Sequence, residues 1–247
     1  YQLEYYVEPL EVSQDVTFSA VVATLAESTK YAYKVFDDDA YFVDEHQAKR
    51  FEELCKRHNN SSLLLPKLLV GDTNIEGYLS DYYKGYTFDK LFLYNLEEKI
   101  KYILLGKDLL LRTNKNKGIV HSDIHFGQLM LNPKKDTVAL LDFDNAKIND
   151  LEPYKRYLSS FAREFLSYNE YDKYLDIHMF NLLTFALLNN IRMKEAFSNL
   201  KNPKYNHYFT SKHALKVLDD ISIYKRNNNY LIDMIDEKQV QKAKNRR

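Results

Sequence analysis

Two short apolar runs separated by a turn, each bordered by an acidic residue, constrain this chain more than any other stretch of it. The runs cover residues 129–131 and 138–141, and the Asn-Pro-Lys-Lys-Asp between them is typical of a turn, so a β-hairpin is predicted. Asp123 precedes the first run, Asp142 ends the second, and Gln128 lies between these acids in the sequence. A hairpin brings both carboxylates to the same end of a small sheet. Two carboxylates and an amide oxygen suit Mg²⁺ and a hydroxyl nucleophile better than they suit zinc.

The residues around these two acids resemble the catalytic motifs of the protein-kinase-like superfamily. The stretch 121–128 reads His-Ser-Asp-Ile-His-Phe-Gly-Gln and is similar to the family's catalytic loop, while Asp-Phe-Asp at 142–144 stands where the family has Asp-Phe-Gly. The order, the spacing and the intervening hairpin all agree. The resemblance implies that Asp123 accepts the proton of the substrate hydroxyl and that Gln128 and Asp142 bind Mg²⁺. The alternative is a surface hairpin that happens to carry acidic residues.

The composition admits a folded protein and argues against several functional classes. With 45% hydrophobic residues, the 247-residue chain can bury a sizeable core, either as one domain or as a tight two-lobed unit. Lys plus Arg and Asp plus Glu each number 35, so the net charge is zero and no nucleic-acid partner is expected. The single Cys55 excludes an internal disulfide and thiolate-rich zinc sites. No apolar run is long enough to span a membrane and no signal peptide is visible, so a cytoplasmic monomer is expected.

The N-terminal part of the chain is predicted to contain a phosphate-binding lysine. Residues 16–25 and 30–36 read as two strands, and in the second strand Ala32, Lys34 and Phe36 share one face. Ala-Tyr-Lys-Val around this lysine resembles the third strand of kinases, which implies that Lys34 binds the α- and β-phosphates of ATP. The alternative is a charge at the edge of the strand whose ammonium group reaches solvent.

A helix is predicted over residues 42–58, and the resemblance calls for a glutamate on it that orients Lys34. Glu45 is the preferred candidate and Glu52 is the alternative; both could instead be solvated. The stretch 10–18, where the family has a glycine-rich phosphate-covering loop, contains no glycine.

The stretch 76–85 resembles the kinase hinge, an apolar strand followed by an acidic residue, an aromatic residue and glycine. This implies that the backbone of Asp81 to Tyr83 binds adenine. By the same resemblance, residues 1–83 form an N-terminal nucleotide-binding lobe and residues 84–247 a mainly helical catalytic lobe. The expected fold is therefore α+β, bilobal and protein-kinase-like, with ATP and Mg²⁺ as cofactors.

The C-terminal part is predicted to be helical around the catalytic loop. Helices are expected at 88–94, 97–112, 211–223 and 228–235. His121 is interpreted as a structural histidine that binds the loop backbone. Residues 161–166 resemble the kinase Ala-Pro-Glu motif, with Arg163 in place of proline. Residues from Asp176 onward resemble the buried helix that supports the catalytic loop; the alternative is a capped amphipathic helix.

These observations predict an ATP-dependent kinase that transfers the γ-phosphate to a hydroxyl acceptor. The region of residues 161–165 and Asp176 favours a protein serine or threonine as the acceptor. The Asp-x-His at Asp123 and the Asp-Phe-Asp at Asp142 favour a small-molecule acceptor, as in the aminoglycoside and choline phosphotransferases. A pseudokinase that serves as a binding scaffold is favoured by the missing glycines and by Gln128 in place of asparagine. An anionic partner for the basic C-terminal end is a minor alternative.

Overall fold

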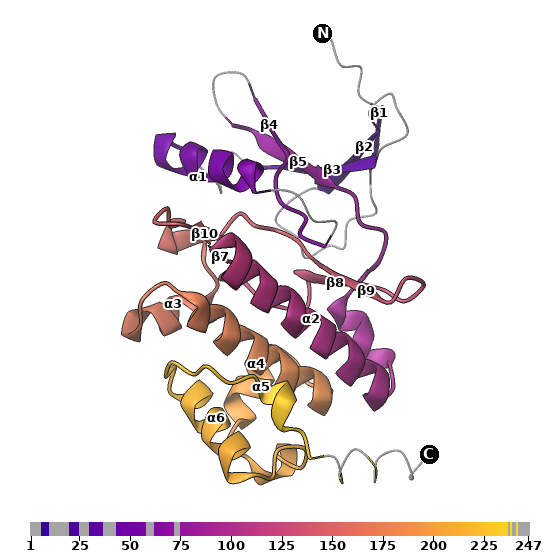
Figure 1. Ribbon diagram of the computed structural model, residues 1–247, viewed down its shortest axis with the longest axis vertical. Coiled ribbons are helices and arrows are strands. Elements are labelled where there is room, and N and C mark those ends of the chain that lie inside the picture. The colour runs from indigo at the N-terminus through magenta and orange to yellow at the C-terminus, as the bar shows by residue number, and fades with distance from the viewer. Residues whose placement is uncertain are drawn as a thin grey trace.

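The computed structural model shows a two-lobed α+β protein, as the sequence predicts (Figure 1). It describes residues 6–9, 20–24, 30–36, 43–57, 62–71, 75–236, 238 and 241. A small sheet with one helix forms the N-terminal lobe, and the larger C-terminal lobe below it is mainly helical (Figure 1). The glycine-free stretch 10–18 and most of the basic C-terminal end lie outside the described residues.

The N-terminal lobe is built on a five-stranded antiparallel sheet with the order β1-β2-β3-β5-β4. The strands are β1 (Tyr6–Pro9), β2 (Ala20–Thr24), β3 (Lys30–Val35), β4 (Leu68–Val70) and β5 (Gly77–Asp81). Lys34 lies in the central strand β3, where its register partners are Ala20 on β2 and Tyr78 on β5. Because side chains alternate along a strand, Lys34 and Phe36 project from the same face. The ring of Phe36 packs 5.2 Å from that of Phe51, so this face is covered by helix α1.

Helix α1 (Glu45–Lys56) begins at the N-cap Asp44, whose carboxylate accepts a hydrogen bond from the amide of Gln47 at 2.9 Å. Its buried residues follow the i, i+3, i+4, i+7 spacing and are Gln47, Arg50, Phe51 and Leu54. The apolar residues of the sequence, Ala48, Phe51, Leu54 and Cys55, predict a different buried stripe, with Ala48 and Cys55 in place of Gln47 and Arg50. The helix itself is confirmed, but its buried face is rotated so that it carries two polar side chains into the molecule.

The predicted hairpin is confirmed. Strands β8 (Leu129–Asn132) and β9 (Thr137–Leu140) pair in register, and β6 (Tyr86–Thr87) adds a third strand in the order β6-β8-β9. The Asn132 carboxamide stabilises the turn, because its oxygen accepts hydrogen bonds from the amides of residues 134 and 135 at 3.0 and 3.1 Å. Gln128 and Asp142 immediately flank the open end of the hairpin, as the sequence pattern predicts.

Helices make up most of the C-terminal lobe. The further elements are η1 (Phe88–Leu93), α2 (Leu96–Lys117), β7 (Ile119–Val120), β10 (Lys147–Ile148), η2 (Lys155–Tyr157), α3 (Ser160–Tyr168), α4 (Lys173–Asn189), α5 (Met193–Asn199), η3 (Pro203–Tyr205), α6 (Lys212–Ser222) and η4 (Leu231–Met234). Helix α2 begins in a capping box between Asn95 and Glu98 and ends at Gly118, whose φ of 63° suits glycine. Within the described residues, no helix is long and apolar enough to cross a membrane.

Helix α4 is the centre of the C-terminal lobe. Every residue from Leu175 to Leu188 is buried, and α2, α3 and α5 all pack against it. This excludes the alternative of an amphipathic helix, which would leave one polar face in solvent. The helix also begins earlier than expected: Asp172 is its N-cap, so Asp176 lies inside the first turn and its carboxylate is available for other contacts.

The helix expected at 228–235 is wrong, since only the 3₁₀ turn η4 forms there. The side chain of Asn181 on α4 explains the difference. Its amide nitrogen donates to the carbonyl of Asn229 at 2.9 Å, and its oxygen accepts from the amide of Leu231 at 2.8 Å. These bonds satisfy backbone groups that a helix would otherwise pair internally, so the segment crosses α4 without becoming helical.

His178 on α4 makes the stability of this lobe sensitive to acid. Its ring lies 5.0 Å from Phe165 and 5.4 Å from Tyr224, and within the described residues neither ring nitrogen has a hydrogen-bond partner. Burial lowers the pKa of His178 to about 4. The unfolded chain binds this proton near pH 6.5, so between about pH 6.5 and pH 4 only the unfolded state is protonated and stability falls as the pH falls.

We expect His178→Leu to remove this acid sensitivity. In wild type, protonation of the unfolded state should lower the free energy of unfolding by about 2 kcal/mol between pH 8 and pH 5. The variant should lack that part of the decrease, as measured by urea unfolding at each pH. His213→Leu, at an exposed position, serves as the matched control and should keep the wild-type pH dependence. An unchanged slope in the His178 variant would contradict the assignment.

Candidate active site

The buried carboxylate of Asp176 fixes the backbone at the start of the catalytic loop. Its two oxygens accept hydrogen bonds from the amides of His121 at 2.9 Å and Ser122 at 2.7 Å. Asn114 on α2 also donates to it at 2.8 Å. Ser122 has a φ of 65°, a left-handed conformation that residues other than glycine rarely adopt, and these bonds hold it there. Asp176 therefore supports the strained turn that presents Asp123, as the sequence predicts.

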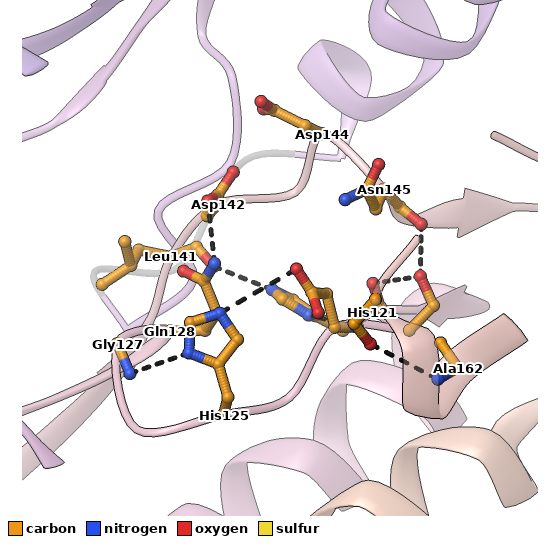
Figure 2. A network of polar contacts seen from close by, with 12 residues as sticks. His121, His125, Gly127, Gln128, Leu141, Asp142, Asp144, Asn145 and Ala162 are labelled. Atoms are coloured by element: carbon orange, nitrogen blue, oxygen red, sulfur yellow. Dashed lines mark hydrogen bonds and ion pairs between the residues drawn. The ribbon is translucent and has the colours of Figure 1, made fainter. Parts of the chain in front are cut away.

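His121 is a structural residue, as predicted. Its Nε2 lies 2.8 Å from the carbonyl oxygen of Leu141, which can only accept, so Nε2 carries the proton (Figure 2). The other ring nitrogen then accepts from the amide of Asp123 at 3.4 Å. Burial lowers the pKa of His121, which keeps the ring neutral. The histidine thus ties the catalytic loop to the end of β9, beside Asp142.

Asp123 presents one carboxylate oxygen without a partner. Within the described residues, its Oδ1 is buried and accepts no hydrogen bond. The hydroxyl of Ser159 lies near the carboxylate, and Nε2 of His125 lies 3.9 Å from its Oδ2. Burial raises the pKa of Asp123, although His125 and Ser159 oppose the shift. A carboxylate of raised basicity with an unpartnered oxygen is suited to accept a proton from a hydroxyl group.

Gln128 and Asp142 lie together across the open end of the hairpin (Figure 2). The Gln128 amide donates to Asp142 Oδ2 at 2.8 Å. Asp142 has a φ of 64°, so a second residue of the site is held in the left-handed conformation. Burial alone would raise the pKa of Asp142, but the attraction of Lys34 and the hydrogen bonds from Lys34 and Gln128 lower it to about 2. Asp142 is therefore a firmly ionised group.

Lys34 reaches from β3 to this end of the hairpin and pairs with two carboxylates. Its ammonium group contacts Oδ1 of Asp142 and lies 2.5 Å from Oδ2 of Asp144. Burial would lower the pKa of Lys34, but Asp142 and then Asp144 outweigh it and raise the pKa above its usual value. Burial also raises the pKa of Asp144 to about 6, against the opposing effect of Lys34. The alternative of a lysine that extends into solvent is therefore excluded.

The expected ion pair between Lys34 and Glu45 does not form. Glu45 is the first residue of α1 and is exposed, and within the part of the chain that the structure describes its side chain makes no hydrogen bond or ion pair. Glu52, the alternative, is exposed as well. The physical reason is the rotation of α1, which directs Gln47 and Arg50 inward and leaves both glutamates in solvent.

Arg50 is a residue of the site that sequence reasoning missed. Its side chain is fully buried, and its guanidinium donates to the carbonyl oxygens of Asp144 at 2.5 Å and Ala146 at 2.8 Å. Its Nε donates to Gln47 at 2.8 Å. The spacing offered a signal, because Arg50 stands on the same helical face as Phe51 and Leu54. The guanidinium of Arg50 thus attaches helix α1 to the backbone of the Asp-Phe-Asp segment and of the residues that follow it.

Two further contacts at the site were also missed. Ser159 is the N-cap of α3, where its hydroxyl accepts from the amide of Ala162 at 3.3 Å and lies near Asp123. The hydroxyl of Tyr78 on β5 donates to Asp144 at 2.8 Å. A serine before an amphipathic helix is a readable N-cap signal, but nothing in the local sequence indicates that Tyr78 reaches the hairpin.

The predicted hinge lies next to the closed end of the hairpin. Asp81 ends β5 and pairs with Lys67 at 2.5 Å, while the hydroxyl of Tyr83 bonds to that of Thr137 at 2.8 Å. Asn132 donates to the carbonyl of Lys84 at 2.8 Å. The side chains of Asp81 and Tyr83 thus have structural partners, and a role in adenine binding would belong to their backbone.

The residues fit a divalent cation. The carboxylate of Asp142 and the carboxamide of Gln128 lie side by side, and the amide nitrogen of Gln128 donates to Asp142 at 2.8 Å. Carboxylate and carboxamide oxygens are the donors that Mg²⁺ prefers. The unpartnered Oδ1 of Asp123 is a further anionic oxygen on the loop that carries Gln128.

Comparison with known proteins agrees with this fold. No family model and no curated protein sequence matches the chain. Among solved structures, it is similar to the Cydia pomonella granulovirus kinase PK-1, with a TM-score of 0.59 and 18% identity, covering 89% of this chain and 88% of that one. At this identity the likeness shows the fold alone: the chain has a protein-kinase-like fold.

We expect Asp176→Asn to destabilise the protein and disorder the catalytic loop. An asparagine would turn one acceptor oxygen into a donor that faces a backbone N–H, which should cost about 3 kcal/mol. Urea unfolding measures this loss, with Asp219→Asn at an exposed position as the matched control. A loss no larger than that of the control would show that Asp176 does not support the loop.

Proposed function

We propose that this protein is an ATP- and Mg²⁺-dependent kinase that transfers the γ-phosphate of ATP to a hydroxyl acceptor, with a protein serine or threonine as the first candidate. One observation carries the proposal: Lys34 from the N-terminal lobe meets Asp142 at the end of the hairpin that follows Asp123. These three groups are the ionisable side chains that phosphoryl transfer requires. The similar viral structure is that of a kinase, which supports the same function.

In this proposal each lobe has its own task. Residues 1–83 bind the nucleotide, with the backbone of Asp81 to Tyr83 next to adenine and Lys34 next to the α- and β-phosphates. Residues 84–247 supply the catalytic loop and the metal ligands. The ion pair between Lys34 and Asp142 joins the two lobes where the phosphates would lie. Lys34 would exchange this carboxylate for the phosphates when nucleotide binds.

The chemistry is positioning and charge neutralisation. Bound Mg²⁺ would neutralise the β- and γ-phosphates, and Asp142 and Gln128 are the residues that would hold it. Asp123 orients the acceptor hydroxyl through its unpartnered Oδ1 and takes its proton. The hydroxyl oxygen bonds to the γ-phosphorus, the bond to the β–γ bridging oxygen breaks, and ADP leaves. Asp176 and His121 keep Asp123 in place throughout.

Two observations favour a small-molecule acceptor as the second candidate. Glu164, in the segment that resembles the kinase Ala-Pro-Glu, is exposed on α3 and, among the described residues, makes no ion pair. The side chain of His125 is 42% exposed, and its Nδ1 accepts from the amide of Gly127 at 3.1 Å, which leaves Nε2 as the donor that faces Asp123. A histidine at the mouth of the site could bind an anionic or hydroxylated small molecule.

We expect wild-type protein to transfer label from γ-labelled Mg·ATP to an acceptor and Asp123→Asn to reduce the rate by at least about 100-fold. The loss follows because an amide cannot take the proton. Autophosphorylation, generic protein acceptors and a panel of aminoglycosides and amino alcohols are assayed in parallel. Asp108→Asn, an exposed position on α2, serves as the charge-matched control and should retain wild-type activity.

The class of acceptor labelled distinguishes the two candidates. Nucleotide binding without transfer to any class, or equal transfer by wild type and Asp123→Asn, would contradict the catalytic role of Asp123. Absence of both binding and transfer would contradict the kinase proposal and favour a scaffold.

A further inference from the structure

The Asp-Phe-Asp segment supplies two carboxylates to one lysine. Lys34 contacts Asp142 and lies 2.5 Å from Asp144, and both contacts lie in a largely buried site where the Lys34 side chain is 14% exposed. Asp142 is the proposed ligand of Mg²⁺, so a bound cation would compete with Lys34 for it. Asp144 would then be the anionic partner that remains beside the lysine.

Helix α1 offers no carboxylate that could pair with Lys34. Its inward face carries Gln47 and Arg50, and Glu45 lies in solvent. Arg50 donates to the carbonyl of Asp144, not to its carboxylate. The helix therefore fixes the backbone of the segment, while the charge that faces Lys34 comes from the segment itself.

The carboxylate of Asp144 is held in place by its surroundings. Its side chain is 4% exposed. Tyr78 donates to Oδ1 at 2.8 Å, which leaves Oδ2 as the oxygen that faces Lys34. Phe143, the preceding residue, is fully buried against the ring of His121 at 4.9 Å. A fixed backbone on one side and a fixed oxygen on the other give Asp144 one orientation toward the lysine.

We propose that Asp144 is the positioning residue for Lys34: it holds the ammonium group toward the phosphates when Asp142 is engaged by the metal, the task that the sequence resemblance gives to Glu45. This explains why the third position of the motif is aspartate in this chain. The catalytic consequence rests on the proposed function, but the pairing itself does not.

The pairing is tested by the reactivity of Lys34 in nucleotide-free protein. Acetylation of Lys34 by acetic anhydride at pH 8 is followed by mass spectrometry in Asp142→Asn, which removes the first partner as a metal would. Adding Asp144→Asn should increase the rate by about 10-fold or more, because an opposite charge close to a lysine stabilises its unreactive ammonium form. Adding Asp150→Asn instead, at an exposed position in the same region, should leave the rate unchanged.

The catalytic consequence is tested by ATP titration of full-length protein. Asp144→Asn should raise the KM for ATP by about 10-fold, in the range of a lost charged hydrogen bond, and Asp144→Glu should recover part of that loss. Glu45→Gln should change neither KM nor the acetylation rate of Lys34. Thermal unfolding of each variant checks that it is folded.

Three results would overturn the inference. One is an acetylation rate of Lys34 that does not respond to Asp144→Asn. A second is an effect of Glu45→Gln equal to that of Asp144→Asn. A third is an Asp144 variant whose defect is corrected by high Mg²⁺, which would make Asp144 a metal ligand. If wild type neither binds nor turns over ATP while Lys34 still responds to Asp144, the proposed function fails and the pairing stands.

Discussion

The buried carboxylate of Asp176 is the interaction on which the candidate site depends. It connects three parts of the C-terminal lobe: α4, on which it lies, α2 through Asn114, and the catalytic loop through two consecutive amides. An ionised group inside a protein core is costly unless it is fully hydrogen-bonded, and this one accepts three bonds. Because those bonds hold Ser122 in a left-handed conformation, the position of Asp123 follows from the position of α4.

The two lobes are joined by charge at the site itself. Lys34 crosses from the sheet to Asp142 and Asp144, and Arg50 crosses from α1 to the backbone of the same segment. Both cations come from the N-terminal lobe, and these partners in the C-terminal lobe belong to one short stretch after β9, residues 142–146. The Asp-Phe-Asp segment is therefore at once a proposed metal ligand and the contact surface between the lobes.

Those parts of the fold that depend on neighbouring residues were predictable from the sequence. The hairpin could be predicted because its turn chemistry and its strands are local, and Asp142 follows directly from it. The exposure of Glu45 was not predictable in this way, because the rotation of a helix about its axis depends on what the helix packs against. The burial of Arg50 depends on carbonyl groups almost a hundred residues away. The segment at 228–235 was misjudged for the same reason, since the side chain of Asn181 on a distant helix satisfies its backbone.

The hairpin β8–β9 also sets the distance between the two proposed subsites for the nucleotide. Its turn end is bonded to the hinge through Asn132 and Thr137, and its open end carries Gln128 and Asp142. If the hinge receives the base and the open end receives the phosphates, the distance between the two subsites is the length of one pair of strands. Each residue adds about 3.3 Å to a strand, so two more residues on each strand would separate the subsites by about 7 Å. Loops elsewhere could vary in length without this effect, whereas an insertion in this hairpin would leave the two subsites too far apart to serve a single nucleotide.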